Sequence, residues 1–161
     1  MEALEISTGR LLAAEKLTIA CAESCTGGLL TSRLTDVAGS SAYVKGSIVS
    51  YSNEIKERLV GVRSDTLAGY GAVSEQTAGE MAEGIRRAIG ADIGVGVTGI
   101  AGPGGGTPQK PVGLVYIAVA GAQGTVIREN HFKGNRGEIK LQTTETALEM
   151  IKNYISAGGR Q

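Results

Sequence analysis

Helical patterns and short apolar runs follow one another along this sequence, and their succession restricts the fold more than any other feature. The run 112–119 is continuously apolar, which is typical of a strand covered on both faces. Other β-rich runs occupy 93–97 and 125–132. Because helices mixed with buried strands pack on both faces of a sheet, the sequence predicts an α/β fold, a single three-layer α/β/α domain.

The remaining segments complete this layout. Strands are also expected over 17–22 and 46–51, and a turn at 121–124 makes the last two runs antiparallel, so a mixed β-sheet is predicted. Asn53 and Ser74 are expected to cap helices, and the final helix is expected to begin near Arg136. The apolar residues at helical spacing are Leu4, Leu11 and Leu12; Leu29, Leu30, Leu34 and Val37; Ile55, Leu59 and Val60; Ala78, Met81, Ala82, Ile85 and Ile89; and Ile139, Leu141, Ala147, Leu148, Ile151, Tyr154 and Ile155.

Composition excludes several classes of partner. The 161 residues are 42% hydrophobic, which suits one domain over 1–161. Sixteen basic residues balance sixteen acidic ones, so no net field attracts nucleic acid or an anionic membrane. No apolar run reaches the roughly 18 residues of a membrane span, and the N-terminus lacks the apolar centre of a signal peptide. Cys21 and Cys25 match neither a disulfide framework nor a zinc site, so we expect a reducing, cytoplasmic setting.

The first candidate site is the segment 22–28, AESCTGG, between a predicted strand and a predicted helix. Ser24 supplies a hydroxyl, and Gly27 and Gly28 supply unhindered amides, so this turn can present a nucleophile beside an oxyanion site. It is not the Gly-x-Ser-x-Gly elbow of α/β hydrolases. The alternative is that Ser24 or Thr26 only caps the following helix.

Lys56 is the candidate base, in the first turn of the helix that follows Asn53. A serine nucleophile needs a neutral amine, but an ordinary lysine pKa near 10.4 leaves only about one lysine in a thousand neutral near pH 7.4. Burial beside a hydroxyl such as that of Tyr51 would lower this pKa. The alternative is a solvated helix lysine.

The third segment, 98–107, is rich in glycine, and its amides suit a phosphate or an amide oxygen. It is no Walker A loop. The pattern Gly94-x-Gly96-x-x-Gly99 matches a dinucleotide motif by letter, but it falls within a predicted strand rather than after one. An ordinary glycine-rich turn is the alternative.

Two other side chains compete for catalytic roles. His131 is the sole histidine, and its one acidic neighbour on the same strand face is Glu129, so we interpret it as structural. Cys25 is a rival nucleophile, because a thiol at a helix N-terminus has a lowered pKa. No cluster of His, Cys and Asp predicts a metal site.

Six ordered motifs lie along the chain: 22–28 AESCTGG, 39–41 GSS, 51–56 YSNEIK, 71–75 GAVSE, 99–103 GIAGP and 110–113 KPVG. From about residue 5 to 155 the chain therefore resembles the C-terminal domain of competence-damage-inducible protein CinA. The resemblance implies a nicotinamide-nucleotide amidase, of the kind called PncC, that acts without cofactor or metal. Such an enzyme hydrolyses nicotinamide mononucleotide to nicotinic acid mononucleotide and ammonia in pyridine-nucleotide recycling.

The resemblance also implies residue roles. Ser24 is the nucleophile, Lys56 its base and Tyr51 a supporting hydroxyl. We further expect Gly27 and Gly28 amides to stabilise the oxyanion and Arg136, at the positive start of a helix, to bind the substrate phosphate, unless it is a surface arginine. The full substrate-binding set is Cys25, Thr26, Gly27, Gly28, Asn53, Thr98, Gly99, Gly102 and Arg136.

Two alternatives from other classes remain open. One is a catalytically silent nucleotide-binding module, because some such domains are known chiefly as parts of larger proteins. The other is an interaction protein in competence or DNA damage, although the neutral charge and the lack of a basic or aromatic surface disfavour DNA contact. The sequence leaves the oligomeric state open, including a homo-oligomer.

Overall fold

The fold is a mixed β-sheet between two layers of helices. A computed structural model describes residues 1–158 of the chain. In chain order the elements are α1 (Leu4–Ala14), β1 (Ile19–Glu23), α2 (Leu29–Thr35), the 3-10 helix η1 (Ser40–Ala42), β2 (Val44–Val49), α3 (Asn53–Val60), α4 (Ser64–Tyr70), α5 (Glu75–Ile89), β3 (Ile93–Gly99), β4 (Leu114–Gly121), β5 (Gly124–His131) and α6 (Arg136–Gly158).

The strand order places three strand ends at one edge of the sheet. Within residues 1–158 the sheet has five strands in the order β2-β1-β3-β4-β5. Strands β2 and β3 both run parallel to β1, whereas β4 is antiparallel to β3 and β5 is antiparallel to β4. The predicted mixed sheet is therefore confirmed. Because the carboxyl ends of β1, β2 and β3 lie at the same edge, the segments that follow them converge there.

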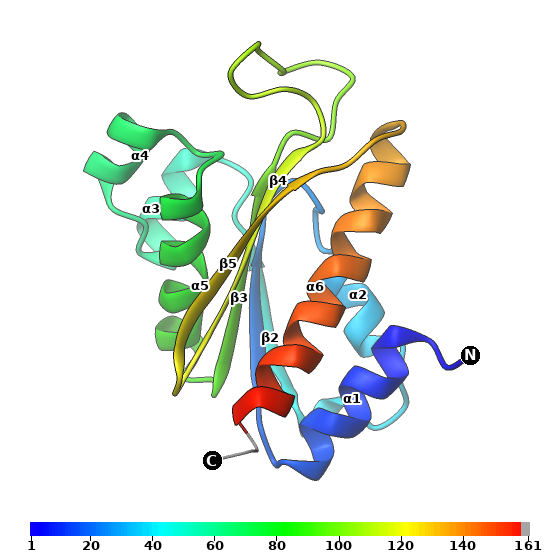
Figure 1. Ribbon diagram of the computed structural model, residues 1–161. Helices are drawn as coiled ribbons and strands as arrows, with labels where there is room; N and C mark the ends of the chain where they lie inside the picture. Colours follow the sequence, from blue (N-terminus) through cyan, green and yellow to red (C-terminus); the bar gives the residue numbers. More distant parts are fainter. Residues whose placement is uncertain (159–161) are drawn as a thin grey trace.

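Helices cover both faces of the sheet, which confirms the predicted three layers. Helices α1, α2 and α6 lie on one face, and α3, α4 and α5 lie on the other (Figure 1). The larger core cluster packs under α1, α2 and α6, and includes Leu12, Leu30 and Ile151, all completely buried. Among the described residues, no helix is both long enough and apolar enough to cross a membrane.

The glycines of the Gly94-x-Gly96-x-x-Gly99 pattern serve packing within β3. A Cβ atom at Gly94 would overlap the carbonyl oxygen of Ala82, and one at Gly96 would overlap that of Ala78, both on α5. The glycines therefore allow α5 to lie close against the sheet. All three belong to the strand itself, so the pattern is not a dinucleotide loop.

Element boundaries differ from the sequence predictions in three ways. Ser52, not Asn53, is the N-cap of α3, since its Oγ accepts a hydrogen bond from the Ile55 amide at 3.2 Å. The strands are displaced by one or two residues from the predicted runs. Helix α4 was not predicted, because it is short and has Leu67 as its one large aliphatic side chain. The predicted Ser74 cap and the start of α6 at Arg136 are confirmed.

Candidate active site

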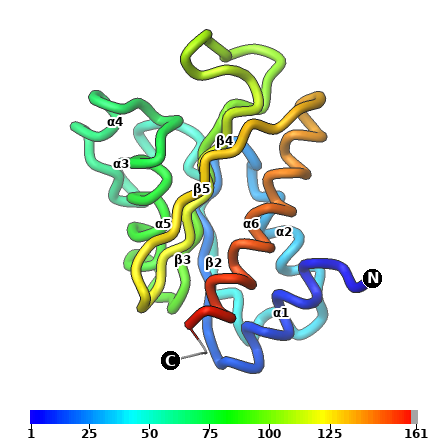
Figure 2. The backbone as a smooth tube through the Cα atoms, in the orientation of Figure 1, coloured from blue at the N-terminus to red at the C-terminus, as the bar shows by residue number. Residues whose placement is uncertain are grey.

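The three segments singled out in the sequence meet at the carboxyl edge of the sheet. They surround a cavity of about 270 Å³. The segment between β3 and β4 rises above this edge as a long loop (Figure 2). The cavity is lined by Ser24, Cys25, Tyr51, Asn53, Lys56, Ala72, Val73, Thr98, Gly99, Ile100, Ala101, Gly102, Gly104, Gly105 and Arg136.

Ser24 directly follows β1 and is held by the sheet. Its backbone amide donates to the Val97 carbonyl at 3.1 Å, which extends the pairing of β1 with β3. Its side chain does not cap α2. That role belongs to Glu23, whose carboxylate accepts hydrogen bonds from the amides of Leu30 and Thr31, both at 2.9 Å. Ser24 is therefore free to face the cavity, where it is 8% exposed.

Lys56 projects from the first turn of α3 into the same cavity and is only 1% exposed. Its Nζ lies 2.9 Å from Ser24 Oγ, 2.7 Å from the Ser50 carbonyl oxygen and 3.2 Å from the Tyr51 carbonyl oxygen. Within residues 1–158, no carboxylate pairs with this amine. Burial lowers the pKa of Lys56 from its ordinary value of 10.5, since the desolvated ammonium is disfavoured. Lys56 is thus not the solvated lysine of the alternative interpretation.

The two carbonyl groups orient the amine. A neutral lysine has two N–H bonds and one lone pair. If the N–H bonds point to the carbonyl oxygens of Ser50 and Tyr51, the lone pair is left for the third neighbour, Ser24 Oγ. The hydroxyl of Ser24 can then donate to Nζ, which is the geometry that general-base activation of a serine requires.

The lowered pKa of Lys56 predicts a pH dependence of stability. Below the folded-state pKa the native protein buries an ammonium, and between that pKa and 10.5 the unfolded chain binds more protons than the native one. The free energy of unfolding of the wild type, measured relative to Lys56→Met by urea titration, should therefore rise with pH through this window. A difference that stays constant from pH 6 to about 10.5 would contradict a depressed pKa.

Tyr51 and Arg136 meet at the mouth of the cavity. Arg136 Nη1 donates to the Gly102 carbonyl oxygen at 2.7 Å, and Nη2 donates to the Tyr51 hydroxyl at 3.1 Å. The expectation that the Tyr51 hydroxyl lies beside the lysine amine is therefore wrong. The Tyr51 carbonyl oxygen has that position, whereas its hydroxyl accepts the hydrogen bond from Arg136 on α6.

The predicted oxyanion donors are displaced from the cavity. The Gly27 amide is engaged with the Ser24 carbonyl oxygen at 3.0 Å, which closes the turn. Neither Gly27 nor Gly28 lines the cavity, and Thr26 is completely buried with its hydroxyl on Glu23. These three residues belong to the nucleophile turn and are not part of the cavity lining.

The other predicted residues do line the cavity. Thr98 and Gly99 end β3, and the Thr98 hydroxyl donates to the Ala72 carbonyl oxygen at 2.7 Å. Gly102 and Asn53 also face the cavity. Sequence reasoning gave no role to Ala72 and Val73, although they lie in the 71–75 motif. The lining contains the guanidinium of Arg136 and no Asp or Glu, so the cavity suits an anionic ligand.

The model of the CinA C-terminal domain family matches residues 1–155 of this chain. The chain belongs to that family. A putative competence-damage inducible protein of Acetivibrio thermocellus is 53% identical over 154 residues, which are 96% of this chain and 37% of that protein. A CinA-like protein of Syntrophus aciditrophicus is 51% identical over 98% of this chain and 38% of its own length. The chain thus spans well under half of these relatives.

Solved structures of CinA proteins have the same fold. The crystal structure of the competence/damage inducible protein CihA from Agrobacterium tumefaciens has a TM-score of 0.89 at 42% identity, covering 95% of this chain and 96% of that one. A CinA superfamily protein from Klebsiella pneumoniae 700603 has a TM-score of 0.92 at 32% identity, covering 96% of each chain.

The rival nucleophile of this CinA domain is poorly suited to its role. Cys25 lines the cavity, but burial raises the pKa of its thiol to about 12, so the expectation of a lowered pKa is wrong. Cys25 lies within the turn that precedes α2, whose first residue is Leu29. His131 bonds to Glu129 at 3.1 Å on the exposed face of β5 and does not line the cavity.

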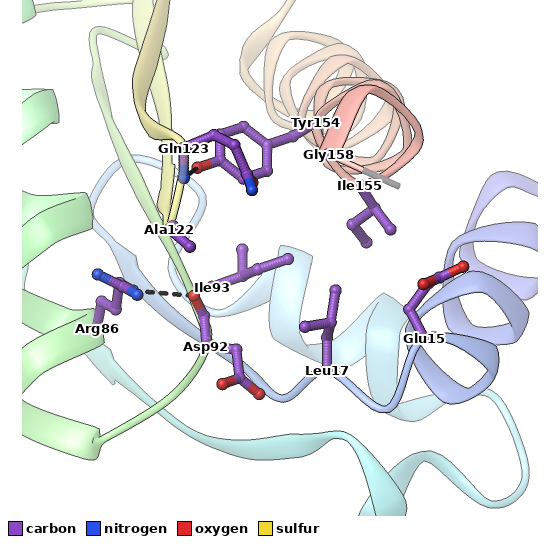
Figure 3. A pocket seen from close by; sticks show the side chains of 11 residues that line it. Glu15, Leu17, Arg86, Asp92, Ile93, Ala122, Gln123, Tyr154, Ile155 and Gly158 are labelled. Atoms are coloured by element: carbon purple, nitrogen blue, oxygen red, sulfur yellow. Dashed lines mark hydrogen bonds between the residues drawn. The ribbon is translucent and has the colours of Figure 1, made fainter. Parts of the chain in front are cut away.

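A second cavity of about 230 Å³ lies at the opposite end of the sheet of the CinA domain (Figure 3). Two of its polar side chains, those of Arg86 and Tyr154, already have partners. Arg86 donates to the Asp92 carbonyl oxygen at 2.9 Å, and the Tyr154 hydroxyl donates to the Gly124 carbonyl oxygen at 2.8 Å. It holds no serine or cysteine beside a base. Across residues 1–158, no group of three or more His, Cys, Asp or Glu residues is arranged to hold a metal ion.

Proposed function

We propose that this CinA domain is a nicotinamide-nucleotide amidase, which hydrolyses nicotinamide mononucleotide to nicotinic acid mononucleotide and ammonia. The observation that carries the proposal is the 2.9 Å approach of Lys56 Nζ to Ser24 Oγ, made by a lysine that is 1% exposed. A buried amine with no carboxylate partner, beside a hydroxyl in a cavity, is the arrangement of a serine nucleophile with a lysine base. The family resemblance supplies the substrate.

The proposed reaction begins with attack of Ser24 Oγ on the carboxamide carbon. Lys56 Nζ takes the proton from Oγ as the C–O bond forms. The same amine then gives this proton to the departing nitrogen, so the C–N bond breaks and ammonia leaves. Water hydrolyses the acyl-serine ester, which releases the carboxylate and restores the hydroxyl. No step needs a cofactor.

The charge of the cavity supports an anionic substrate. Among residues 1–158, Arg136 uses two of its five N–H donors on protein atoms, and its remaining donors can bind phosphate oxygens. Arg136 is also the first residue of α6, where the backbone amides and the helix dipole favour negative charge. Arg136 is exposed, as the alternative of a surface arginine expects, but its side chain also bridges the Gly102 carbonyl oxygen and the Tyr51 hydroxyl beside the cavity.

Arg136→Met tests this assignment. Because hydrogen bonds to charged groups contribute about 1.5–3 kcal/mol, KM for nicotinamide mononucleotide should rise about 10- to 150-fold. Hydrolysis of nicotinamide riboside, which has no phosphate, should change little. Steady-state kinetics on both substrates measures the difference, with Arg128→Met on β5 as the matched control. An equal loss on both substrates would show that Arg136 only supports the cavity wall.

The proposed activity is tested directly by ammonia release from nicotinamide mononucleotide with purified protein. Mass spectrometry should identify nicotinic acid mononucleotide in equal amount. Binding of the mononucleotide without ammonia release would instead favour the silent nucleotide-binding module. If the protein neither binds the mononucleotide nor releases ammonia from it, the proposed substrate is wrong. That result would favour the interaction protein.

Metal removal is expected to leave this activity unchanged. The reaction as proposed uses an amine base and a hydroxyl nucleophile, so it has no step for a metal-bound water. The rate should be the same before and after exhaustive dialysis against a chelator. Loss of activity that one added metal restores would contradict the Ser24 and Lys56 mechanism.

A further inference from the structure

Glu23 carries a buried carboxylate to which the proposed reaction assigns no role. It ends β1 and is 0% exposed. Within residues 1–158, no lysine, arginine or histidine pairs with it. An ionised carboxylate in such a place is costly unless several donors satisfy its oxygens.

Four donors do so, and all come from the segment that follows Ser24. Oε1 accepts from the Thr26 hydroxyl at 2.6 Å and from the Leu30 amide at 2.9 Å. Oε2 accepts from the Thr31 amide at 2.9 Å and from the Thr31 hydroxyl at 2.6 Å. The Thr31 hydroxyl is also 2.7 Å from that of Ser47 on β2. One carboxylate therefore fixes the turn, the start of α2 and the neighbouring strand.

The nucleophile turn needs such an anchor. Gly27 and Gly28 both have positive φ angles, 61° and 102°, and glycine loses more conformational freedom than any other residue when it is fixed. Ser24 precedes these glycines, and its amide is held by the Val97 carbonyl oxygen. The carboxylate of Glu23 closes the other side of the turn through Thr26.

The backbone of Glu23 reaches the base as well. Its carbonyl oxygen accepts from the Ser50 amide at 2.7 Å. The Ser50 carbonyl oxygen in turn lies 2.7 Å from Lys56 Nζ. The same residue thus connects the segment that carries the nucleophile with the segment that orients the amine.

We propose that Glu23 is a positioning residue that holds Ser24 Oγ within reach of Lys56 Nζ by anchoring the 24–28 turn to the start of α2. This inference rests on the proposed serine and lysine chemistry. Glu23 does not touch the substrate and takes no proton. It fixes the separation across which the proton moves, and a misplacement of about 1 Å can cost about a hundredfold in rate.

The test is Glu23→Gln, which keeps the size of the side chain but places an NH₂ group against donors. The kcat for nicotinamide mononucleotide should fall about a hundredfold per folded molecule, with KM changed less than about threefold. Labelling of Ser24 by a fluorophosphonate should slow by a similar factor. A crystal structure of the variant should show Oγ and Nζ separated by more than hydrogen-bonding distance.

Asp92→Asn is the matched control, at the opposite end of β1. The Asp92 carboxylate accepts from the Thr18 amide at 2.8 Å and from its hydroxyl at 3.0 Å, and it lies by the second cavity (Figure 3). Its loss should lower the unfolding temperature without changing kcat or labelling. If Glu23→Gln does not fold, Thr31→Val removes one of the four donors. Its labelling should then slow about tenfold, as expected for the loss of about 1–2 kcal/mol.

Two outcomes would overturn the inference. One is a folded Glu23→Gln protein in which Ser24 is labelled at the wild-type rate and the distance from Ser24 Oγ to Lys56 Nζ is unchanged. The other is a Glu23→Gln protein that is less stable but has a normal kcat per folded molecule. Failure of the proposed function gives a different result. If the wild type releases no ammonia from nicotinamide mononucleotide, the substrate is wrong, while the crystal structures of the variants still decide the role of Glu23.

Discussion

Ser24→Ala should lower kcat by at least about a thousandfold, because the base has no function once the nucleophile that acts with it is removed. Cys25→Ala should keep appreciable activity. The two side chains are adjacent, but they differ in their environment. Lys56 Nζ contacts Ser24 Oγ at 2.9 Å, whereas burial raises the pKa of Cys25 to about 12 and suppresses its thiolate.

Acid quench during turnover, followed by peptide mass spectrometry, separates the two nucleophiles. The acyl group should be found on Ser24. Alkylation of the wild type should inhibit only through added bulk, because Cys25 lines the cavity. The control is alkylation of Cys25→Ala, whose residual rate should not change. The other cysteine, Cys21, is only 1% exposed and should not react with the reagent. An acyl group trapped on Cys25 would contradict the assignment of Ser24 as the nucleophile.

Lys56→Ala and Lys56→Arg should both lose most activity, about a thousandfold or more. Arginine keeps the positive charge but cannot supply a neutral amine near pH 7, so it separates base chemistry from electrostatic stabilisation. The wild-type kcat/KM should rise with pH as Lys56 loses its proton, with a midpoint below the ordinary 10.5.

Circular dichroism should show that both lysine variants fold. Lys45→Arg is the matched control, because the Lys45 amine also donates to a backbone carbonyl oxygen, that of Gly90, but lies outside the cavity. Its activity should equal that of the wild type. A near-normal rate for Lys56→Arg would show that Lys56 provides charge only.

The layered fold was predictable because its signals are local. The continuous apolar run that became β4 and the Gly121–Gly124 turn were sufficient to predict a buried strand and an antiparallel pair. Helix α4 lacked such a signal. Its start is fixed by Glu80 on α5, which accepts hydrogen bonds from the Arg63 amide and the Thr66 hydroxyl, and such a contact between elements has no trace in local periodicity.

In the candidate site too, residues with a local sequence signal were predictable, whereas contacts between distant elements were not. Ser24 and Lys56 could be named as candidates because they lie in motifs that follow strands, and the family resemblance implied their roles. Their supporting groups could not be named. Lys56 contacts the carbonyl oxygen of Tyr51, whereas Arg136 donates to the Tyr51 hydroxyl. These partners depend on the position of α6 relative to the cavity. Sequence spacing also could not show that the Gly27 amide is used to close its own turn.

The nucleophile and the base come from opposite helical layers. Ser24 leads into α2 on one face of the sheet, whereas Lys56 belongs to α3 on the other (Figure 1). The 2.9 Å approach of the two atoms thus joins a turn that Glu23 anchors to α2 with a lysine on the α3 layer. Regain of serine reactivity during refolding should therefore follow the slower of the two layers to dock, and a partly assembled chain would be chemically inert.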